Sequence, residues 1–188
     1  MKKKPTIHQT KVVASSRLFK IEALKLEFPN GVKCDYERLA NSGVGAVLIV
    51  PILRKQGQKD QLLLIREYGA GTERYELGFP KGKVEKGEEL VNAANREIME
   101  EVGYESRHLT YLKGVSLAPS YMEHITHIFL AEDLFEHRED GDEPEELEVV
   151  QWDLDLLDQL LAEEDFSEGR SIAALYLVKD YLKNHSKK

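Results

Sequence analysis

The residues from Gly82 to Tyr104, GKVEKGEELVNAANREIMEEVGY, carry the strongest structural signal in the chain. Apolar residues recur here at intervals of three and four, at Val91, Ala94, Ile98 and Val102. This spacing predicts an amphipathic helix over residues 88–103, because residues three or four apart share one helix face. Gly103 stands where such a helix would end, since glycine readily adopts the left-handed conformation of a helix terminus.

Three carboxylates cluster on the same predicted helix. Glu97, Glu100 and Glu101 are three and four residues apart, so they repel one another, and they lie near the helix C-terminus, where the macrodipole disfavours negative charge. A hard divalent cation would relieve both effects, and oxygen ligands suit Mg²⁺ or Mn²⁺. The alternative is a solvated helix face whose glutamates pair with Arg96.

The residues around the cluster favour the metal site. The fixed positions of the pattern Gly-x5-Glu-x7-Arg-Glu-U-x-Glu-Glu-x-Gly-U, in which U is aliphatic, are all matched, by Gly82, Glu88, Arg96, Glu97, Glu100, Glu101 and Gly103. Only the last U departs, since Tyr104 occupies it. This segment resembles the Nudix box, and the chain is therefore similar to the Nudix hydrolase superfamily.

The resemblance implies an α/β fold, the Nudix α/β/α sandwich with a mixed sheet, in which the box at 82–104 forms a loop, a helix and a loop. It implies hydrolysis of nucleoside diphosphates linked to another group, with Mg²⁺ (or Mn²⁺) as cofactor. The metal ligands that it implies are the backbone carbonyl of Lys81 and the carboxylates of Glu97, Glu100 and Glu101, of which Glu97 and Glu101 also count as catalytic. The structural support of the box would come from Gly82, Glu88 and Arg96.

Hydropathy along the rest of the chain fits an α/β protein. Runs of apolar residues predict strands at 44–52, 61–66, 111–117, 125–131 and 149–152, and helical periodicity predicts helices at 154–161 and 172–182. The first of these strands is apolar at nearly every position, which indicates burial on both faces. The acidic segment 132–148 contains Gly141 and Pro144 and is predicted to be a loop.

Residues 6–40 form an N-terminal β unit. Leu24, Leu26 and Phe28 alternate with polar residues, the turn 29–31 (PNG) follows, and alternation resumes over 32–36. We therefore divide the chain into an antiparallel β annex at 1–40 and a Nudix hydrolase domain at 41–188. In similar Nudix enzymes such an annex makes the homodimer.

Two further segments resemble the ADP-ribose pyrophosphatase branch of the family, namely 65–68 (IREY) and 75–82 (YELGFPKG). In that branch an arginine before the box contacts the substrate diphosphate, which Arg66 matches, and Glu76 corresponds to a supporting carboxylate. The alternative for Arg66 is a surface arginine that pairs with Glu67 or Glu73. The alternative for Glu76 is a charge at the end of a strand, without a role at the site. Over nearly the whole chain, the pattern is most similar to bacterial enzymes acting on ADP-ribose, diadenosine polyphosphates and NADH with release of AMP.

The same branch holds adenine with an aromatic residue and a glutamate on the annex. Tyr36 and Glu37 match these positions, as a ring to stack on the base and a carboxylate to accept from its amine. Adjacent residues on a strand point to opposite faces of the sheet, however. Tyr36 and Glu37 can therefore contact the same base only if the base lies at an edge of the sheet or if one of the two contacts is made by the backbone. The alternative for Tyr36 is packing beside Val32 and Cys34.

The catalytic base in this branch is a glutamate on an acidic loop after the box. Residues 141–147 (GDEPEEL) match that loop in position and pattern, with Glu143 as the first candidate and Glu145 as the second. Either residue would accept a proton from metal-bound water. The alternative is a solvated acidic loop without a catalytic role.

Composition limits the partners. The chain has 188 residues with 26 Lys and Arg against 34 Asp and Glu, a net charge of -8, which argues against nucleic-acid binding. No apolar run is long enough to cross a membrane, and the single Cys34 excludes an internal disulfide. We expect a cytoplasmic enzyme acting on a small ADP-linked molecule. The alternatives are a Nudix hydrolase of other nucleotide specificity, or a non-catalytic ADP-ribose sensor.

Overall fold

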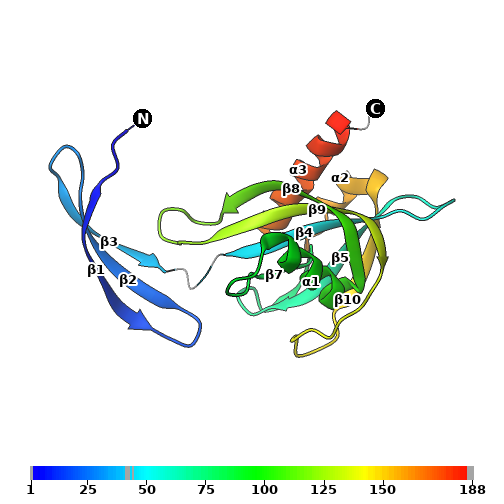
Figure 1. The fold of residues 1–188 in the computed structure, drawn as a ribbon, viewed down its shortest axis with the longest axis horizontal. Coiled ribbons are helices and arrows are strands. Elements are labelled where there is room, and N and C mark those ends of the chain that lie inside the picture. Colours follow the sequence, from blue (N-terminus) through cyan, green and yellow to red (C-terminus); the bar gives the residue numbers. More distant parts are fainter. Residues whose placement is uncertain (1, 41–42, 44, 186–188) are drawn as a thin grey trace.

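The chain folds into two separate β-sheets (Figure 1). The structure is a computed structural model, which describes residues 2–40, 43 and 45–185. The N-terminal sheet contains β1 (Thr6–Ser15), β2 (Lys20–Glu27) and β3 (Lys33–Leu39), all antiparallel in that order. Leu24 lies opposite Tyr36 and Leu26 opposite Cys34, so the predicted hairpin is confirmed. The turn between these strands contains Gly31 at φ +83°, a conformation that glycine adopts without strain.

The second sheet has seven strands, in the central order β10-β5-β4-β9-β8. Its strands are β4 (Ala46–Leu53), β5 (Gln61–Gly69), β6 (Arg74–Gly78), β7 (Lys81–Lys83), β8 (Tyr104–Ser116), β9 (Ile125–Glu136) and β10 (Glu148–Asp153). β4 runs parallel to β9, whereas the other pairs are antiparallel, with β6 beside β5 and β7 beside β4. The predicted mixed sheet is thus confirmed.

Helices cover both faces of this sheet, and the alternation of side chains along β4 shows how. The side chains of Val47, Ile49 and Leu53 pack in one core with helix α1 (Leu90–Val102). Those of Leu48, Val50 and Ile52 pack in the other core with α2 (Leu157–Leu160) and α3 (Gly169–His185). Each fully buried Leu, Ile or Val stabilises the fold by about 2 kcal/mol. The predicted burial of this strand on both faces is confirmed; Val44, where we expected it to begin, lies outside the described residues.

Several predicted boundaries were wrong in the outer parts of the sheet. β8 begins at Tyr104 rather than at 111, and β9 extends to Glu136, so the segment 132–148 is only partly a loop. The added residues of β8 and β9 pair with each other at the edge of the sheet. Their side chains are mostly polar, so the alternation of apolar residues that marks a half-buried strand is missing there. The short strands β6 and β7 were not predicted, and the helix expected at 154–161 is a 3-10 turn, Leu154–Leu156, followed by α2.

The N-terminal sheet stands apart from the rest of the chain in Figure 1. At its junction with the second sheet, Leu39 forms a bridge with Met122, and its amide N–H donates to the carbonyl of Tyr121 at 2.7 Å. Arg38 pairs with Glu123 at 3.3 Å in the same place. Within the described part of the chain, no helix has the length and apolar character that crossing a membrane requires.

Candidate active site

Helix α1 places the carboxylate cluster at the edge of a cleft. Its apolar residues Ala94, Ile98 and Val102 are buried against the sheet, and Gly103 ends the helix at φ +76°, as predicted. This orientation leaves Glu97 and Glu101 only 5% and 3% exposed. A charged side chain that is buried this deeply requires partners, because desolvation of an isolated charge is costly.

Arg96 supplies one of those partners. Its Nη1 donates to Glu97 at 2.7 Å and to Glu100 at 3.2 Å, and its Nε donates to Glu88 at 2.9 Å. Its Nη2 also donates to the backbone carbonyl of Lys83 at 3.0 Å. One guanidinium thus ties the helix to the preceding loop, which agrees with the supporting role expected of Arg96 and Glu88.

Burial dominates the protonation of the two inner glutamates. It raises the pKa of Glu97 to about 7, against the opposing attraction of Arg96. It also raises the pKa of Glu101 well above its ordinary value, although the backbone N–H of Lys81 donates to this carboxylate at 2.8 Å. Without a further cation, burial therefore favours the protonated, neutral form of these two carboxyl groups.

Gly82 allows the preceding loop to approach this cluster closely. It belongs to β7, which pairs with β4, and a Cβ at this position would lie 2.1 Å from the Glu97 carboxylate. Only glycine fits without displacing that carboxylate. The structural role expected of Gly82 therefore has a direct geometric reason.

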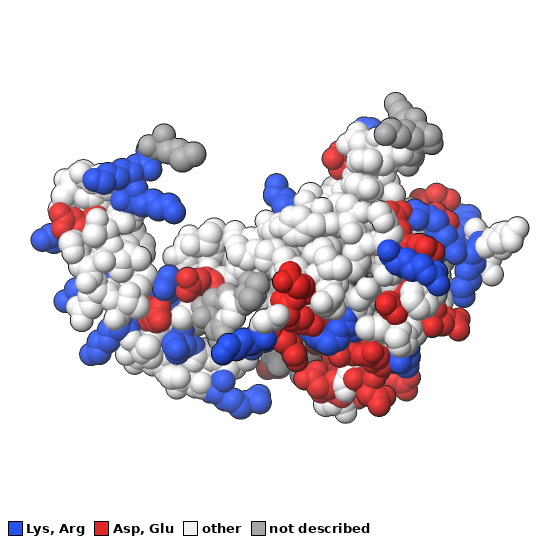
Figure 2. All heavy atoms as spheres, in the orientation of Figure 1, with Lys and Arg blue, Asp and Glu red and all other residues white. Residues whose placement is uncertain are grey.

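A cleft of about 990 Å³ opens over these groups. Carboxylates line the cleft from four segments, namely α1, β5, the box loop and the acidic loop. They belong to Glu67, Glu85, Glu97, Glu100, Glu101, Asp140, Asp142 and Glu143. The cationic lining residues are Lys81, Lys83, Lys86 and Arg96. Figure 2 shows acidic side chains gathered on one part of the surface.

The donor set fits a divalent cation by its chemistry. In the described part of the chain, no three metal-ligating side chains converge as they stand, because Glu97 and Glu100 turn to Arg96 and Glu101 turns to the amide of Lys81. Buried, mutually repelling carboxylates next to a backbone turn are nevertheless suitable oxygen ligands for a hard cation. A bound cation would compete with Arg96 for Glu97 and Glu100, and with the amide of Lys81 for Glu101.

The two candidate bases on the acidic loop have different surroundings. Glu143 lines the cleft, and its charge contributes to the raised pKa of Glu97 and of Glu100. Glu145 instead accepts a hydrogen bond from the Tyr75 hydroxyl at 2.9 Å, which raises the pKa of that tyrosine. The geometry therefore favours Glu143 over Glu145 for contact with the reaction centre.

Arg66 and Glu76 do not line the cleft. Arg66 pairs with Asp165 and, at 3.1 Å, with Glu148, so it connects β5 to the segments before α3 and at the start of β10. Glu76 pairs with Arg74 at 2.9 Å, which lowers the pKa of Glu76. Neither placement supports the expected contact of Arg66 with the diphosphate or a supporting role of Glu76 at the box.

Tyr36 and Glu37 lie on β3 of the N-terminal sheet, a strand that stands apart from α1 and β7 in Figure 1, and neither residue lines the cleft of the same chain. The side chain of Tyr36 is exposed, so the alternative of core packing beside Val32 and Cys34 is wrong. Its ring lies 6.4 Å from that of Phe28. Within one chain, the two residues are available for a ligand but are not close to the box.

Sequence reasoning missed other residues at the site. The Lys81 side chain pairs with Glu67 at 2.5 Å. The two residues are fourteen positions apart, and neither the helical nor the strand periodicity of the sequence indicates this contact. Tyr75 was overlooked as the anchor of Glu145, because the two residues are 70 positions apart. Asp140 and Asp142 also line the cleft, and only the acidic composition of their loop pointed to them.

Comparison with known proteins agrees with this architecture. The model of the NUDIX domain matches residues 44–175, and that of the NudE-type Nudix hydrolase N-terminal domain matches residues 5–38. The chain is 48% identical to ADP compounds hydrolase NudE of Escherichia coli (98% of this chain, 96% of that protein) and 30% identical to ADP-ribose pyrophosphatase of Bacillus subtilis (90% and 92%). A crystal structure of ADP compounds hydrolase superposes with a TM-score of 0.90 at 46% identity, covering 100% of this chain and 99% of that one. The chain therefore belongs to the Nudix hydrolase family.

Proposed function

We propose that the protein hydrolyses the diphosphate bond of ADP-linked compounds, such as ADP-ribose, diadenosine polyphosphates and NADH, and releases AMP. The observation that carries the proposal is the pair of buried carboxylates, Glu97 and Glu101, beneath a cleft that Glu143 also lines. The names of the two relatives, which act on ADP compounds and ADP-ribose, support the substrate class.

The metal belongs to the same proposal. Nudix hydrolases generally use divalent metal ions, and we infer Mg²⁺ (or Mn²⁺) from the oxygen donors of this site. Glu97, Glu100, Glu101 and the carbonyl of Lys81 would hold it. When bound, such a cation would neutralise the charge of the diphosphate and lower the pKa of the water that it coordinates.

The chain's own residues complete the chemistry. Glu143 would accept the proton of the attacking water, since its carboxylate lines the cleft that holds the box glutamates. Arg96 keeps those glutamates in position through its contacts with Glu88 and the carbonyl of Lys83. The lysines along the box loop, Lys83 and Lys86, add positive charge on the substrate side of the cleft.

The two candidate bases give different expected results. We expect Glu143→Gln to lower kcat by roughly a hundredfold or more, because loss of a general base costs 10²–10⁴ in rate. Glu145→Gln is the matched control and should retain most activity, since its carboxylate bonds to Tyr75. Single-turnover measurements on both variants check this, and a larger loss in Glu145→Gln than in Glu143→Gln would reverse the assignment.

We further propose that the annex at 1–40 forms a homodimer, in which Tyr36 and Glu37 bind adenine at the partner's cleft. The annex leaves apolar side chains exposed on β1, on β3 and in the turns between the strands: Ile7, Val12, Val13, Leu18, Phe19, Val32 and Tyr36. Exposed apolar area of this kind is typical of association surfaces. The Nudix domain at 41–188 would then receive its adenine site from a second chain.

Sedimentation equilibrium at micromolar concentration tests the dimer. Val12→Lys on the annex should shift the protein toward monomer, because it introduces a charge into the apolar surface. Val91→Lys is its control, since Val91 is 49% exposed against 47% for Val12 but lies on α1. A wild-type protein that sediments as a monomer would contradict both the dimer and the adenine site.

Release of AMP from ADP-ribose, diadenosine triphosphate, NADH and a nucleoside triphosphate, with Mg²⁺ and with chelator, tests the function. We expect metal-dependent turnover of the first three and little of the last. Binding of ADP-ribose without turnover would favour the sensor instead, and preferred turnover of the nucleoside triphosphate would favour another specificity. The cytoplasmic location inferred from the sequence stays a prediction.

A further inference from the structure

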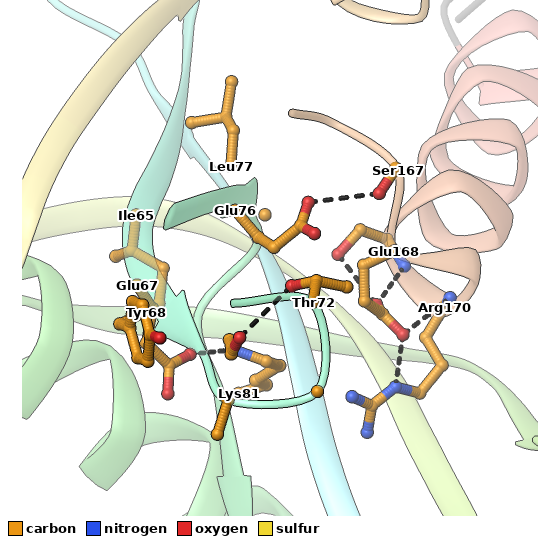
Figure 3. A pocket seen from close by; sticks show the side chains of 15 residues that line it. Ile65, Glu67, Tyr68, Thr72, Glu76, Leu77, Lys81, Ser167, Glu168 and Arg170 are labelled. Atoms are coloured by element: carbon orange, nitrogen blue, oxygen red, sulfur yellow. Dashed lines mark hydrogen bonds and ion pairs between the residues drawn. The ribbon is translucent and has the colours of Figure 1, made fainter. Parts of the chain in front are cut away.

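A second cavity lies beside the box cleft, between the β5–β6 turn and the start of α3 (Figure 3). It has a volume of about 560 Å³, which lies in the range of small-molecule sites. Its walls come from residues 67–72, 76–78, 167–168 and 170–171, together with Ile65 and Lys81. The box glutamates belong to the first cleft and do not line this cavity.

The two cavities adjoin at one ion pair. Glu67 and Lys81 line both of them, and Lys81 Nζ lies 2.5 Å from Glu67 Oε2. Lys81 also reaches the box through its backbone N–H, which donates to Glu101. The two cavities therefore share a wall at this pair, next to the box.

The charges around the second cavity are already paired. Glu76 accepts from Arg74 at 2.9 Å, and Glu168 accepts from Arg170 at 2.7 Å, as well as from the backbone N–H of Ser171 at 2.8 Å. Three carboxylates and two cations line the cavity once Glu67 and Lys81 are included. A phosphate would gain little here, because each cation is engaged and the carboxylates repel an anion.

The remaining surface suits an uncharged ring with hydroxyl groups. Ile65 and Leu77 supply buried apolar walls, and the ring of Tyr68 is half exposed. The hydroxyl of Thr72 donates to the carbonyl of Gly69 at 3.2 Å, and that of Ser167 donates to Glu76 at 3.1 Å, so each hydroxyl oxygen is left to act as an acceptor. A heterocycle or a ribose matches both kinds of surface, since aromatic faces stack and ribose hydroxyls need such partners.

We propose that this cavity binds one nucleoside-like half of the substrate, a ribosyl group with its attached ring, while the box cleft holds the diphosphate. The proposal rests on the hydrolysis proposed above and adds a second subsite to it. The occupant is neutral and polar, and is the half linked to the other phosphate, because the adenine is assigned above to Tyr36 and Glu37, which do not line this cavity. Its position beyond the Lys81–Glu67 pair makes the cavity a determinant of which ADP-linked compounds are accepted.

The substitution Ala70→Trp tests the cavity by filling it. Ala70 is exposed on the β5–β6 turn and lines the cavity, so a large side chain is tolerated there without disturbing the core. Ala162→Trp makes the same change at an exposed position outside both cavities. We expect Ala70→Trp to raise KM for NADH or diadenosine triphosphate by tenfold or more, with a smaller change in kcat, and Ala162→Trp to leave both constants unchanged.

Calorimetric titration of AMP and of reduced nicotinamide mononucleotide, whose ring is neutral, provides a second measurement without turnover. Weaker binding of the reduced nicotinamide mononucleotide by Ala70→Trp, with unchanged AMP binding, supports the proposed occupant, whereas weaker AMP binding alone would overturn it and the adenine site proposed on the annex. Thr72→Val should weaken the same mononucleotide, because it removes a hydroxyl at nearly constant shape. Unchanged KM and unchanged binding of both mononucleotides in folded Ala70→Trp would overturn the subsite. Absence of wild-type turnover with any ADP-linked compound would instead overturn the hydrolase, and the titrations would still report on the cavity.

Discussion

Glu97→Gln is expected to lower kcat by roughly a thousandfold while the protein remains folded. A ligated divalent cation contributes several kcal/mol of transition-state stabilisation, and about 4 kcal/mol corresponds to that factor. The amide keeps the shape of the side chain but loses the negative charge that would bind the cation. The fold should tolerate this change, because burial raises the pKa of Glu97 to about 7, so the fold already accommodates its neutral form near neutral pH.

Glu89→Gln is the matched control for this prediction. Glu89 precedes α1, is exposed, and makes no side-chain capping hydrogen bond, so the same substitution should leave both activity and stability unchanged. Steady-state kinetics with saturating Mg²⁺ and thermal unfolding without metal compare the two variants. A folded Glu97→Gln protein with wild-type turnover would contradict the assignment of the box as the reaction centre.

The sequence was most informative where structure depends on local periodicity. The spacing of Ala94, Ile98 and Val102 predicted a helix that ends at Gly103, and the structure has α1 over Leu90–Val102. The same spacing placed Glu97 and Glu101 near one another, since helix geometry fixes which residues share a face. The alternation across the turn at 29–31 predicted the β2–β3 hairpin for a similar reason.

Contacts between distant segments were beyond what these patterns indicate. The role of Arg66 was inferred from a neighbouring motif, but the structure pairs it with Asp165 and Glu148, 99 and 82 residues further along. The bond between Tyr75 and Glu145 distinguishes the two candidate bases, and it depends on how the acidic loop folds back over β6. Neither contact has a periodic signature, because each depends on the packing of whole elements.

The strands β6 and β7 were missed for a related reason. β7 covers only Lys81–Lys83, and its hydrogen bonds with β4 exist because the box loop lies along that central strand. Three residues without apolar alternation carry no strand signal. This pairing nevertheless brings Gly82 against the Glu97 carboxylate, so a short strand that the sequence does not announce determines the shape of the candidate metal site.

Gly82→Ala should therefore remove activity by displacing one side chain. The added Cβ would lie 2.1 Å from the carboxylate of Glu97, and the contact falls at the end of a flexible side chain, which can rotate away at low cost. We expect turnover to fall by roughly a hundredfold or more, because a carboxylate moved from its position no longer completes the ligand set. Thermal stability should change by only a few degrees, since the three atoms nearest to the added Cβ all belong to the Glu97 carboxylate.

Gly169→Ala separates this steric effect from a general effect of replacing glycine. A Cβ at Gly169, the exposed first residue of α3, meets no atom within 4 Å, and Gly169 lines neither cavity, so this variant should keep wild-type activity and stability. Titration of Mn²⁺ into both variants and the wild type, followed by electron paramagnetic resonance, measures the ligand set without turnover. Weaker Mn²⁺ binding in Gly82→Ala alone would link the loss of activity to the displaced Glu97 carboxylate. Full activity in Gly82→Ala would instead show that this carboxylate is free to move during the reaction, and the close approach of β7 would then have no catalytic purpose.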